Sequence, residues 1–184
     1  MSADFQIHQL GHPLLRQPAE PVTDMLDPAF QTQLDQLLTF VIDKGGMGIA
    51  APQVGISRRF FILSSHPNAR YPSAPDVPPF VVINPEILAH ADTVTKDWEG
   101  CLSLPGIRGL VPRYDWIEVR YITRDGKTVE TRYEGFLARV FQHELDHTEG
   151  RVFIDRVEST LELMMEQEWQ HQIARDRTSG ASNN

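Results

Sequence analysis

The chain has 184 residues, of which 17 are Lys or Arg and 25 are Asp or Glu, so its net charge is -8. This length is typical of one domain with a core large enough to fold without disulfides, and the single cysteine, Cys101, excludes an intrachain disulfide. The acidic balance argues against general affinity for nucleic acid or anionic membranes. No apolar run approaches the roughly 20 residues of a membrane span, and the first residues lack a signal-peptide pattern, so we expect a cytoplasmic protein.

The first part of the chain predicts an irregular arm followed by a helix. Three prolines interrupt residues 5–22 and make a regular element improbable there. Asp27 and Pro28 then form a typical helix start, as N-cap and first helical residue. Apolar residues recur at helical spacing after them, and Gly45 and Gly46 end the run. We therefore expect an amphipathic helix that packs on the core.

The segment 46–55 is rich in small residues and follows the helix directly. Its glycines have neither the spacing nor the lysine of a phosphate-binding loop, which excludes nucleotide binding here. Residues 59–63 predict a strand, and the proline-rich segment 64–79 predicts an exposed loop. A second strand is expected over 80–83, ending at Asn84 and the proline after it.

The next part of the chain predicts antiparallel strands. Residues 93–112 contain glycines and prolines that indicate an extended, kinked backbone. Residues 116–122 and 128–133 alternate as strands do, and 124–127 has the composition of a hairpin turn. The sheet is therefore expected to be at least partly antiparallel.

The last part of the chain predicts two helices. The first lies between Gly135 and Gly150, and a short strand is expected over 152–154. A capping box at 159–162 then predicts the start of a final helix, and an apolar residue every four positions predicts that one face of it packs against the body of the domain. These positions are Leu161, Met165, Trp169 and Ile173. We expect a disordered tail over 176–184.

The chemistry is concentrated in the helix that ends before Gly150. His143 and His147 are four residues apart, so on a helix they point the same way and can bind one metal ion. Glu144 flanks them in the His-Glu-x-x-His arrangement of metal hydrolases, in which the glutamate handles protons. Two solvated histidines on a surface helix are the alternative. The apolar residues at 137, 140 and 141 argue against it, because they place the motif beside an apolar face.

A catalytic metal usually has three protein ligands and one open position, so a third ligand is required. A general zinc peptidase would take it from a downstream carboxylate or histidine, and four carboxylates qualify: Glu149, Asp155, Glu158 and Glu162. Cys101 is the other candidate, because a thiolate is a strong ligand for iron(II) or zinc. The residues alone leave this choice open.

Three segments together resemble a known family. Residues 48–55, 99–103 and 142–147 read Gly-Ile-Ala-Ala-Pro-Gln-Val-Gly, Glu-Gly-Cys-Leu-Ser and Gln-His-Glu-Leu-Asp-His. In order and approximate spacing they resemble the three signature motifs of peptide deformylase, a family that removes the formyl group from the initiator methionine of nascent proteins. The resemblance covers most of residues 10–157. Thr148 and the long 64–79 loop depart from the family's usual pattern, but neither is a motif residue.

The predicted elements and this resemblance imply an α+β fold. Mixed, largely antiparallel β-sheets are expected to pack around a central metal-binding helix with the HExxH motif, with one helix before it and one after it. We expect a single deformylase-like catalytic domain over residues 1–175. The final helix resembles that of the common bacterial form. By the same resemblance, this helix is a candidate for a transient contact with the ribosome. No sequence-specific nucleic acid binding and no membrane association are expected.

The resemblance also assigns roles to residues. Cys101, His143 and His147 would bind one divalent metal, iron(II) by resemblance, although zinc, nickel or cobalt would suit the same ligands. Metal-bound hydroxide would attack the formyl carbon, and Glu144 would move the protons. The Gln53 amide and the backbone N–H of Leu102 would stabilise the oxyanion.

Further residues are candidates for binding the N-formylmethionyl peptide: Met47, Gly48, Glu99, Gly100, Phe136 and Val140. Ordinary core packing is an equal alternative for Met47, Phe136 and Val140. Arg108 and Arg113 could hold substrate or pair with acidic neighbours, and we favour structural pairing for Arg113.

Overall fold

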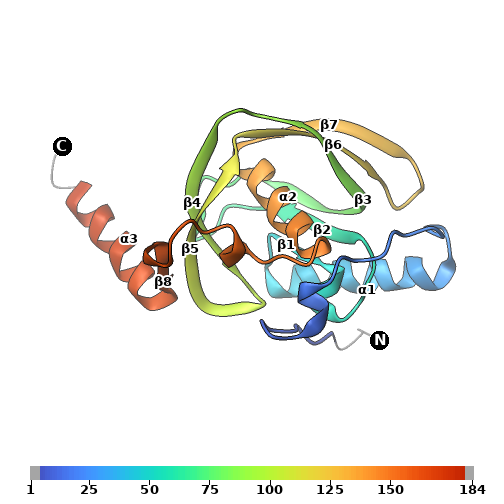
Figure 1. Ribbon diagram of the computed structural model, residues 1–184, viewed down its shortest axis with the longest axis horizontal. Coiled ribbons are helices and arrows are strands. Elements are labelled where there is room, and N and C mark those ends of the chain that lie inside the picture. The colour runs from blue at the N-terminus through green and yellow to red at the C-terminus, as the bar shows by residue number, and fades with distance from the viewer. Residues whose placement is uncertain (1–4, 181–184) are drawn as a thin grey trace.

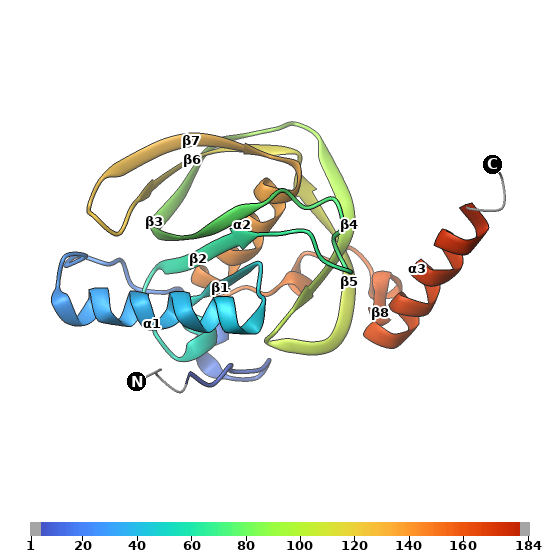
Figure 2. The ribbon, with the colours of Figure 1, turned by 180° about the vertical axis from the view of Figure 1, so that it is seen from behind.

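A computed structural model describes residues 5–180 and has a mixed α+β fold with antiparallel sheets (Figures 1 and 2). One sheet has five strands in the order β1-β2-β3-β6-β7, and the other has three in the order β4-β5-β8. The strands are β1 (Gly48–Ala50), β2 (Phe60–Ser65), β3 (Val77–His90), β4 (Val94–Cys101), β5 (Leu104–Tyr114), β6 (Trp116–Ile122), β7 (Thr128–Glu134) and β8 (Leu163–Met165). The α-helices of the described part are α1 (Pro28–Lys44), α2 (Gly135–Thr148) and α3 (Glu166–Gly180).

Helix α1 begins and ends where the sequence predicts. The Asp27 carboxylate accepts a hydrogen bond from the N–H of Phe30 at 2.9 Å, which satisfies one of the free donors of the first turn. Gly45 ends the helix in the left-handed conformation, at φ 59°, which a glycine adopts without strain. Both helix ends are therefore determined by local residues.

Strand β2 explains how the two main helices are arranged. Its side chains are buried along its whole length, because helices cover both faces of the five-stranded sheet. Phe60 and Ile62 belong to the core cluster that includes the buried face of α1. Phe61 and Leu63 belong to the cluster that includes the buried face of α2. Alternate residues of one strand thus fix α1 and α2 on opposite faces.

The predicted end of a strand at Asn84 is wrong, since β3 continues to His90. Asn84 has a φ of 50°, and the pairing with β6 shifts register between Ile83 and Glu86. The Asn84 side-chain oxygen accepts a hydrogen bond from the N–H of Val22 at 2.9 Å, and its side-chain nitrogen donates one to the Val22 carbonyl at 2.8 Å. A local irregularity therefore accommodates the proline at 85 within the strand.

Residues 93–112 form most of a hairpin. Strands β4 and β5 pair from Val94 with Tyr114 to Cys101 with Leu104, with a register shift between Glu99 and Cys101. The predicted hairpin over 116–133 is confirmed, since β6 and β7 pair in register from Trp116 to Ile122. The predicted helix after Gly135 is likewise confirmed as α2.

The chain after α2 departs most from the sequence prediction. Residues Phe153–Asp155 form a 3-10 turn and not a strand. The predicted capping box at 159–162 is also a 3-10 turn, followed by β8, so the final helix begins only at Glu166.

The predicted packing face of this last helix is therefore confirmed at Trp169 and wrong at Leu161 and Met165. Leu161 and Met165 lie before α3 and are 92% and 61% exposed, whereas Trp169 is buried. Helix α3 extends away from the body of the molecule (Figures 1 and 2). It continues to Gly180, so the first five residues of the expected disordered tail are helical. The rest of that tail, 181–184, lies outside the described residues. None of the described helices is both long and apolar enough to span a bilayer.

Replacing Phe141 with alanine is expected to destabilise the fold strongly. Its ring is fully buried on α2 and contacts Phe61 edge-on, with centroids 5.1 Å apart, and Tyr133 at 5.7 Å. The free energy of unfolding should fall by about 3–5 kcal/mol, because a large cavity is left, as measured by urea denaturation. Ile42→Ala, at a side chain 62% exposed on α1, is the control and should change it by less than about 1 kcal/mol. Equal losses for both variants would contradict the proposed packing.

Candidate metal centre

Helix α2 directs the predicted residues into the interior. Its buried side chains include Phe141 and Leu145 on the sheet side and also Glu144 and His147. The rings of His143 and His147 lie side by side with centroids 5.1 Å apart. The i, i+4 spacing thus places both imidazoles on one buried face of the helix, as the sequence predicts.

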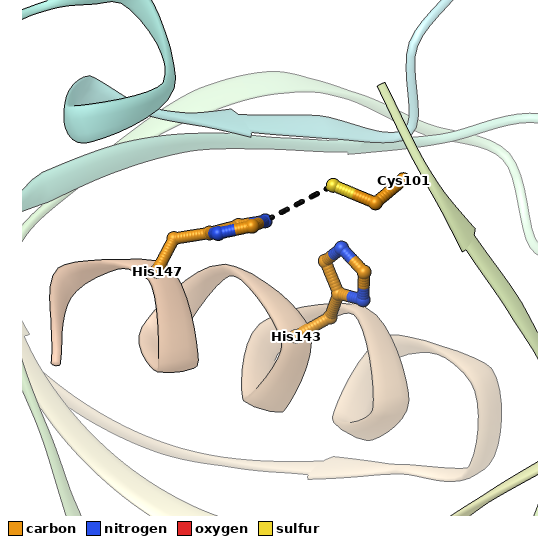
Figure 3. Close-up of side chains that lie close together, drawn as sticks. All are labelled: Cys101, His143 and His147. Carbon is orange, nitrogen blue, oxygen red and sulfur yellow. Dashed lines mark hydrogen bonds between the residues drawn. The ribbon is translucent and has the colours of Figure 1, made fainter. Parts of the chain in front are cut away.

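Cys101 faces these histidines from the end of β4 (Figure 3). Its Sγ lies 3.3 Å from Nε2 of His147, and the three candidate ligand atoms of Cys101, His143 and His147 all lie within 4.8 Å of one another. Burial would raise the pKa of the Cys101 thiol, but the neighbouring His147 and His143 lower it well below its ordinary value. The sulfur is therefore available as a thiolate, the form that binds metals.

Glu99 orients one of these histidines. Its Oε2 lies 2.9 Å from Nδ1 of His143, and a hydrogen bond there leaves Nε2 free to bind a metal. Burial would raise the pKa of Glu99, but Arg113 and His143 lower it far below its ordinary value. The pKa of His143 is in turn raised, against the effect of burial, by Cys101 and Glu99. Surroundings that favour a cation at this position suit a divalent metal.

Arginines surround Glu99 and complete a buried network. Arg113 donates two hydrogen bonds to Glu99, at 2.9 and 3.0 Å, and a third to Asp146, at 2.6 Å. Arg139 donates to Glu99 at 2.9 Å, and Arg156 pairs with Asp146. The structural pairing that the sequence favours for Arg113 is confirmed. The role of Arg139 was missed, although a charged residue four positions before His143, on a helix that packs on the core, was a signal for it.

Glu144 lies in the same pocket with one free carboxylate oxygen. Its side chain is buried, and its Oε2 has no hydrogen-bond partner among residues 5–180. Burial raises the pKa of Glu144 to about 7, although the nearby histidines lower it in part. A Cβ at Gly48 would lie 2.6 Å from Glu144 Oε1, so a larger residue there would force the carboxylate to move. Such a group can accept and release a proton near neutral pH.

Gln53 contacts the sulfur of Cys101 from the turn after β1. Its Oε1 accepts a hydrogen bond from the N–H of Ala50 at 2.9 Å, and its Nε2 donates to Cys101 Sγ at 3.3 Å and to Ser103 Oγ at 3.1 Å. Leu102 lies in the turn between β4 and β5, with 42% of its surface exposed. The structure thus brings the three sequence motifs to one site.

A pocket of about 600 Å³ opens beside these groups. The residues predicted for substrate binding all line it: Met47, Gly48, Glu99, Gly100, Phe136 and Val140. The Glu99 carboxylate is hydrogen-bonded to His143, Arg113 and Arg139. Its polar atoms therefore contact other side chains of the protein. Tyr71 and Glu166 line this pocket as well, and no motif or spacing in the sequence indicates this.

The downstream carboxylates that a general peptidase would use lie elsewhere. Asp155 pairs with Arg16, Glu149 pairs with Arg59, and Glu158 and Glu162 pair with Lys96. None of them belongs to the His and Cys cluster of the described chain. Cys101 is therefore the third member of that cluster.

The comparisons with known proteins agree with this geometry. Residues 5–162 match the family model of polypeptide deformylase. The chain belongs to the polypeptide deformylase family. It is 48% identical to peptide deformylase 2 of Nostoc sp., over 92% of this chain and 95% of that one. It is 40% identical to peptide deformylase 1 of Bordetella pertussis, over 82% of this chain and 86% of the other.

Solved structures of the family share the fold. A class I type b peptide deformylase from Acinetobacter baumannii with bound Met-Ala-Ser has a TM-score of 0.81 and 41% identity, over 85% of this chain and 100% of that one. The Thermotoga maritima peptide deformylase has a TM-score of 0.75 and 39% identity, over 84% of this chain and 98% of that one. The protein is therefore an enzyme of a metal-dependent family, and its Cys101, His143 and His147 form a possible metal site.

Replacing Glu99 with glutamine is expected to weaken metal binding about 10- to 100-fold, since it changes the hydrogen-bond partner of His143, a candidate metal ligand. A competition titration with a chromogenic chelator measures this affinity. Glu86→Gln, at an exposed carboxylate that pairs with Arg120, is the matched control and should leave it unchanged. Circular dichroism establishes whether both variants are folded. Wild-type metal affinity in a folded Glu99→Gln protein would contradict the orienting role.

Proposed function

We propose that this protein hydrolyses the N-formyl group of N-formylmethionyl nascent polypeptides, with residues 1–175 as a single catalytic domain. The observation that carries the proposal is the meeting of Cys101, His143 and His147 within 4.8 Å, beside the partly unpartnered Glu144 carboxylate. Nascent chains are the substrate, so the proposed location is the cytoplasm of a bacterial-type cell.

One divalent metal would be held by Cys101 Sγ and by one ring nitrogen each of His143 and His147. The donor set fits such an ion, because it combines a soft thiolate with two imidazoles. When bound, the metal would activate a water molecule and polarise the formyl group. We propose iron(II) as the physiological metal, and zinc, nickel or cobalt suit the same ligands in purified protein.

Glu144 would move the proton. As a carboxylate, its free Oε2 takes a proton from the attacking water. The carboxyl then delivers the proton to the amine nitrogen of methionine as the C–N bond breaks, which releases formate and a free N-terminus. Burial raises the pKa of Glu144 above its ordinary value, which favours a group that must both accept and donate a proton.

Two donors would stabilise the oxygen on which negative charge develops. The Gln53 amide is fixed by the bond from Ala50 N–H to its Oε1, and this leaves Nε2 directed at the site. The backbone N–H of Leu102, next to Cys101, is the second donor. Donors held in place before the reaction stabilise a developing charge without reorganisation.

The pocket would bind the peptide around these groups. Strand β1 lies at the edge of its sheet, so its backbone near Gly48 can pair with an extended peptide. Met47, Phe136 and Val140 would contact the methionine side chain, and Gly100 would shape the wall before Cys101. Glu99 would contribute through His143.

Two other interpretations are less well supported. A general zinc peptidase would need a ligand downstream of His147, and the candidates pair with basic side chains elsewhere. A transient ribosome contact through α3 would meet electrostatic repulsion from RNA phosphates, because Glu166 and Glu168 lie in its first turn.

Replacing Glu144 with alanine is expected to lower kcat for formyl-Met-Ala-Ser at least about 100-fold, because the proton acceptor is lost. Metal should still bind, since the three ligands remain. Formate release from anaerobically purified protein measures the activity, and elemental analysis of the same samples should find about one metal, iron, per chain. Full hydrolysis by a metal-loaded Glu144→Ala protein would contradict the mechanism.

Gln53→Ala is expected to lower kcat about 100- to 1000-fold, as removal of an oxyanion donor does. Leu102→Ala keeps its backbone N–H and should remain within about fivefold of wild type. Steady-state kinetics with the same peptide measures both variants. Equal losses in the two variants would show that the Leu102 side chain matters, and a fully active Gln53→Ala protein would exclude the amide as a donor.

A further inference from the structure

Arg108 is a buried cation that the proposed mechanism does not use, and the start of α3 holds it. Its Nε donates to Oε2 of Glu166, and its Nη2 donates to Oε1 at 3.1 Å. The guanidinium carbon lies 4.7 Å from the ring centroid of Trp169, whose side chain is buried. A two-bond ion pair and an aromatic face together fix the orientation of a guanidinium.

Arg108 in turn contacts two parts of the pocket wall. Its Nη1 donates to the hydroxyl of Tyr71 at 3.1 Å, and the Tyr71 ring packs on Phe136 with centroids 5.1 Å apart. The guanidinium also lies against Gly100, where a Cβ would come within 2.5 Å of Nη1. Arg108 therefore joins α3 to the aromatic side of the pocket and to the residue before Cys101.

Tyr71 lies on a turn that is closed by its own hydrogen bonds. The Asn68 side-chain oxygen accepts from the N–H groups of Arg70 and Tyr71, each at 2.9 Å. Glu166 also pairs with Arg70, at 3.6 Å. One carboxylate of α3 thus contacts the turn directly through Arg70 and indirectly through Arg108.

We propose that Glu166 and Trp169 are positioning residues for methionine recognition. By fixing Arg108, they fix Tyr71 against Phe136 and so determine the aromatic wall of the pocket. The inference rests on the proposed function, since it assigns the Phe136 side of the pocket to the methionine side chain. It gives the base of α3 a role in substrate affinity, although most of this helix extends away from the body (Figure 2).

The test is Glu166→Gln, which keeps the size of the side chain and removes its charge. The KM for formyl-Met-Ala-Ser should rise roughly five- to tenfold, while kcat and metal content stay within about twofold. Glu168→Gln makes the same change on the same turn, at a side chain 71% exposed, and should leave KM unchanged. A role only in fastening α3 would lower the unfolding temperature of Glu166→Gln without changing KM, and would overturn the proposal.

A double-variant cycle tests whether Glu166 acts through Arg108. Arg108→Gln should raise KM, and adding Glu166→Gln should change it further by less than about twofold. Independent, multiplying effects would overturn the proposed path. If Arg108→Gln does not fold, Trp169→Leu takes its place and should raise KM in the same direction; an unchanged KM there would contradict the role of Trp169.

Calorimetric binding of the product Met-Ala-Ser separates this inference from the proposed function. Its Kd should weaken in Glu166→Gln by the same factor as KM. A wild-type protein that releases no formate would contradict the proposed function, even if Met-Ala-Ser binding responds to Glu166→Gln. An active wild type with unchanged KM and unchanged Met-Ala-Ser affinity in Glu166→Gln would contradict only the role of α3.

Discussion

The ion pair between Glu99 and Arg113 is the interaction on which the site depends. Both side chains are about 95% removed from solvent, and such a pair is costly unless hydrogen bonds satisfy its polar atoms. Here Glu99 accepts from two arginines and lies against His143, while Arg113 also reaches Asp146. Glu99 belongs to β4 and Arg113 to β5, whereas His143 and Asp146 belong to α2. The network therefore fixes α2 against the hairpin that holds Cys101, two residues after Glu99.

The five-stranded sheet supports the same geometry from the opposite side of α2. Phe61 and Leu63 pack against the apolar face of α2, while Phe60 and Ile62 pack against α1. The apolar face of α2 therefore cannot rotate without losing core contacts, and its polar face is directed at Cys101 and Gln53. Apolar packing on one side and a charge network on the other together determine where the two histidines point.

Local sequence was enough to predict α1, the β6–β7 hairpin and the helix with the two histidines, because their caps, turn residues and spacing act within a few positions. The bend at Asn84 was missed because its amide bonds Val22, 62 positions earlier. The four-residue apolar repeat of the last segment predicts one helix, but Leu161 lies in a turn and Met165 in β8. The Cys101 site was predicted only by resemblance, since spacing alone left several downstream carboxylates open as ligands.

The contacts of Arg108 are partly predictable: the need for partners follows from its burial, but the identity of the partners does not follow from nearby sequence. Its sequence neighbours give no indication that Tyr71, Glu166 and Trp169 surround it, because they are 37 to 61 positions away along the chain. Yet its side chain is buried as deeply as that of Arg113, and a buried guanidinium requires partners that satisfy its donors. Arg113 finds them in the centre of the fold, where one of them, Glu99, orients His143. Arg108 finds them in the loop that holds Tyr71 and in helix α3, both outside the two sheets. The need of a buried guanidinium for partners therefore links the Tyr71 side of the pocket to α3.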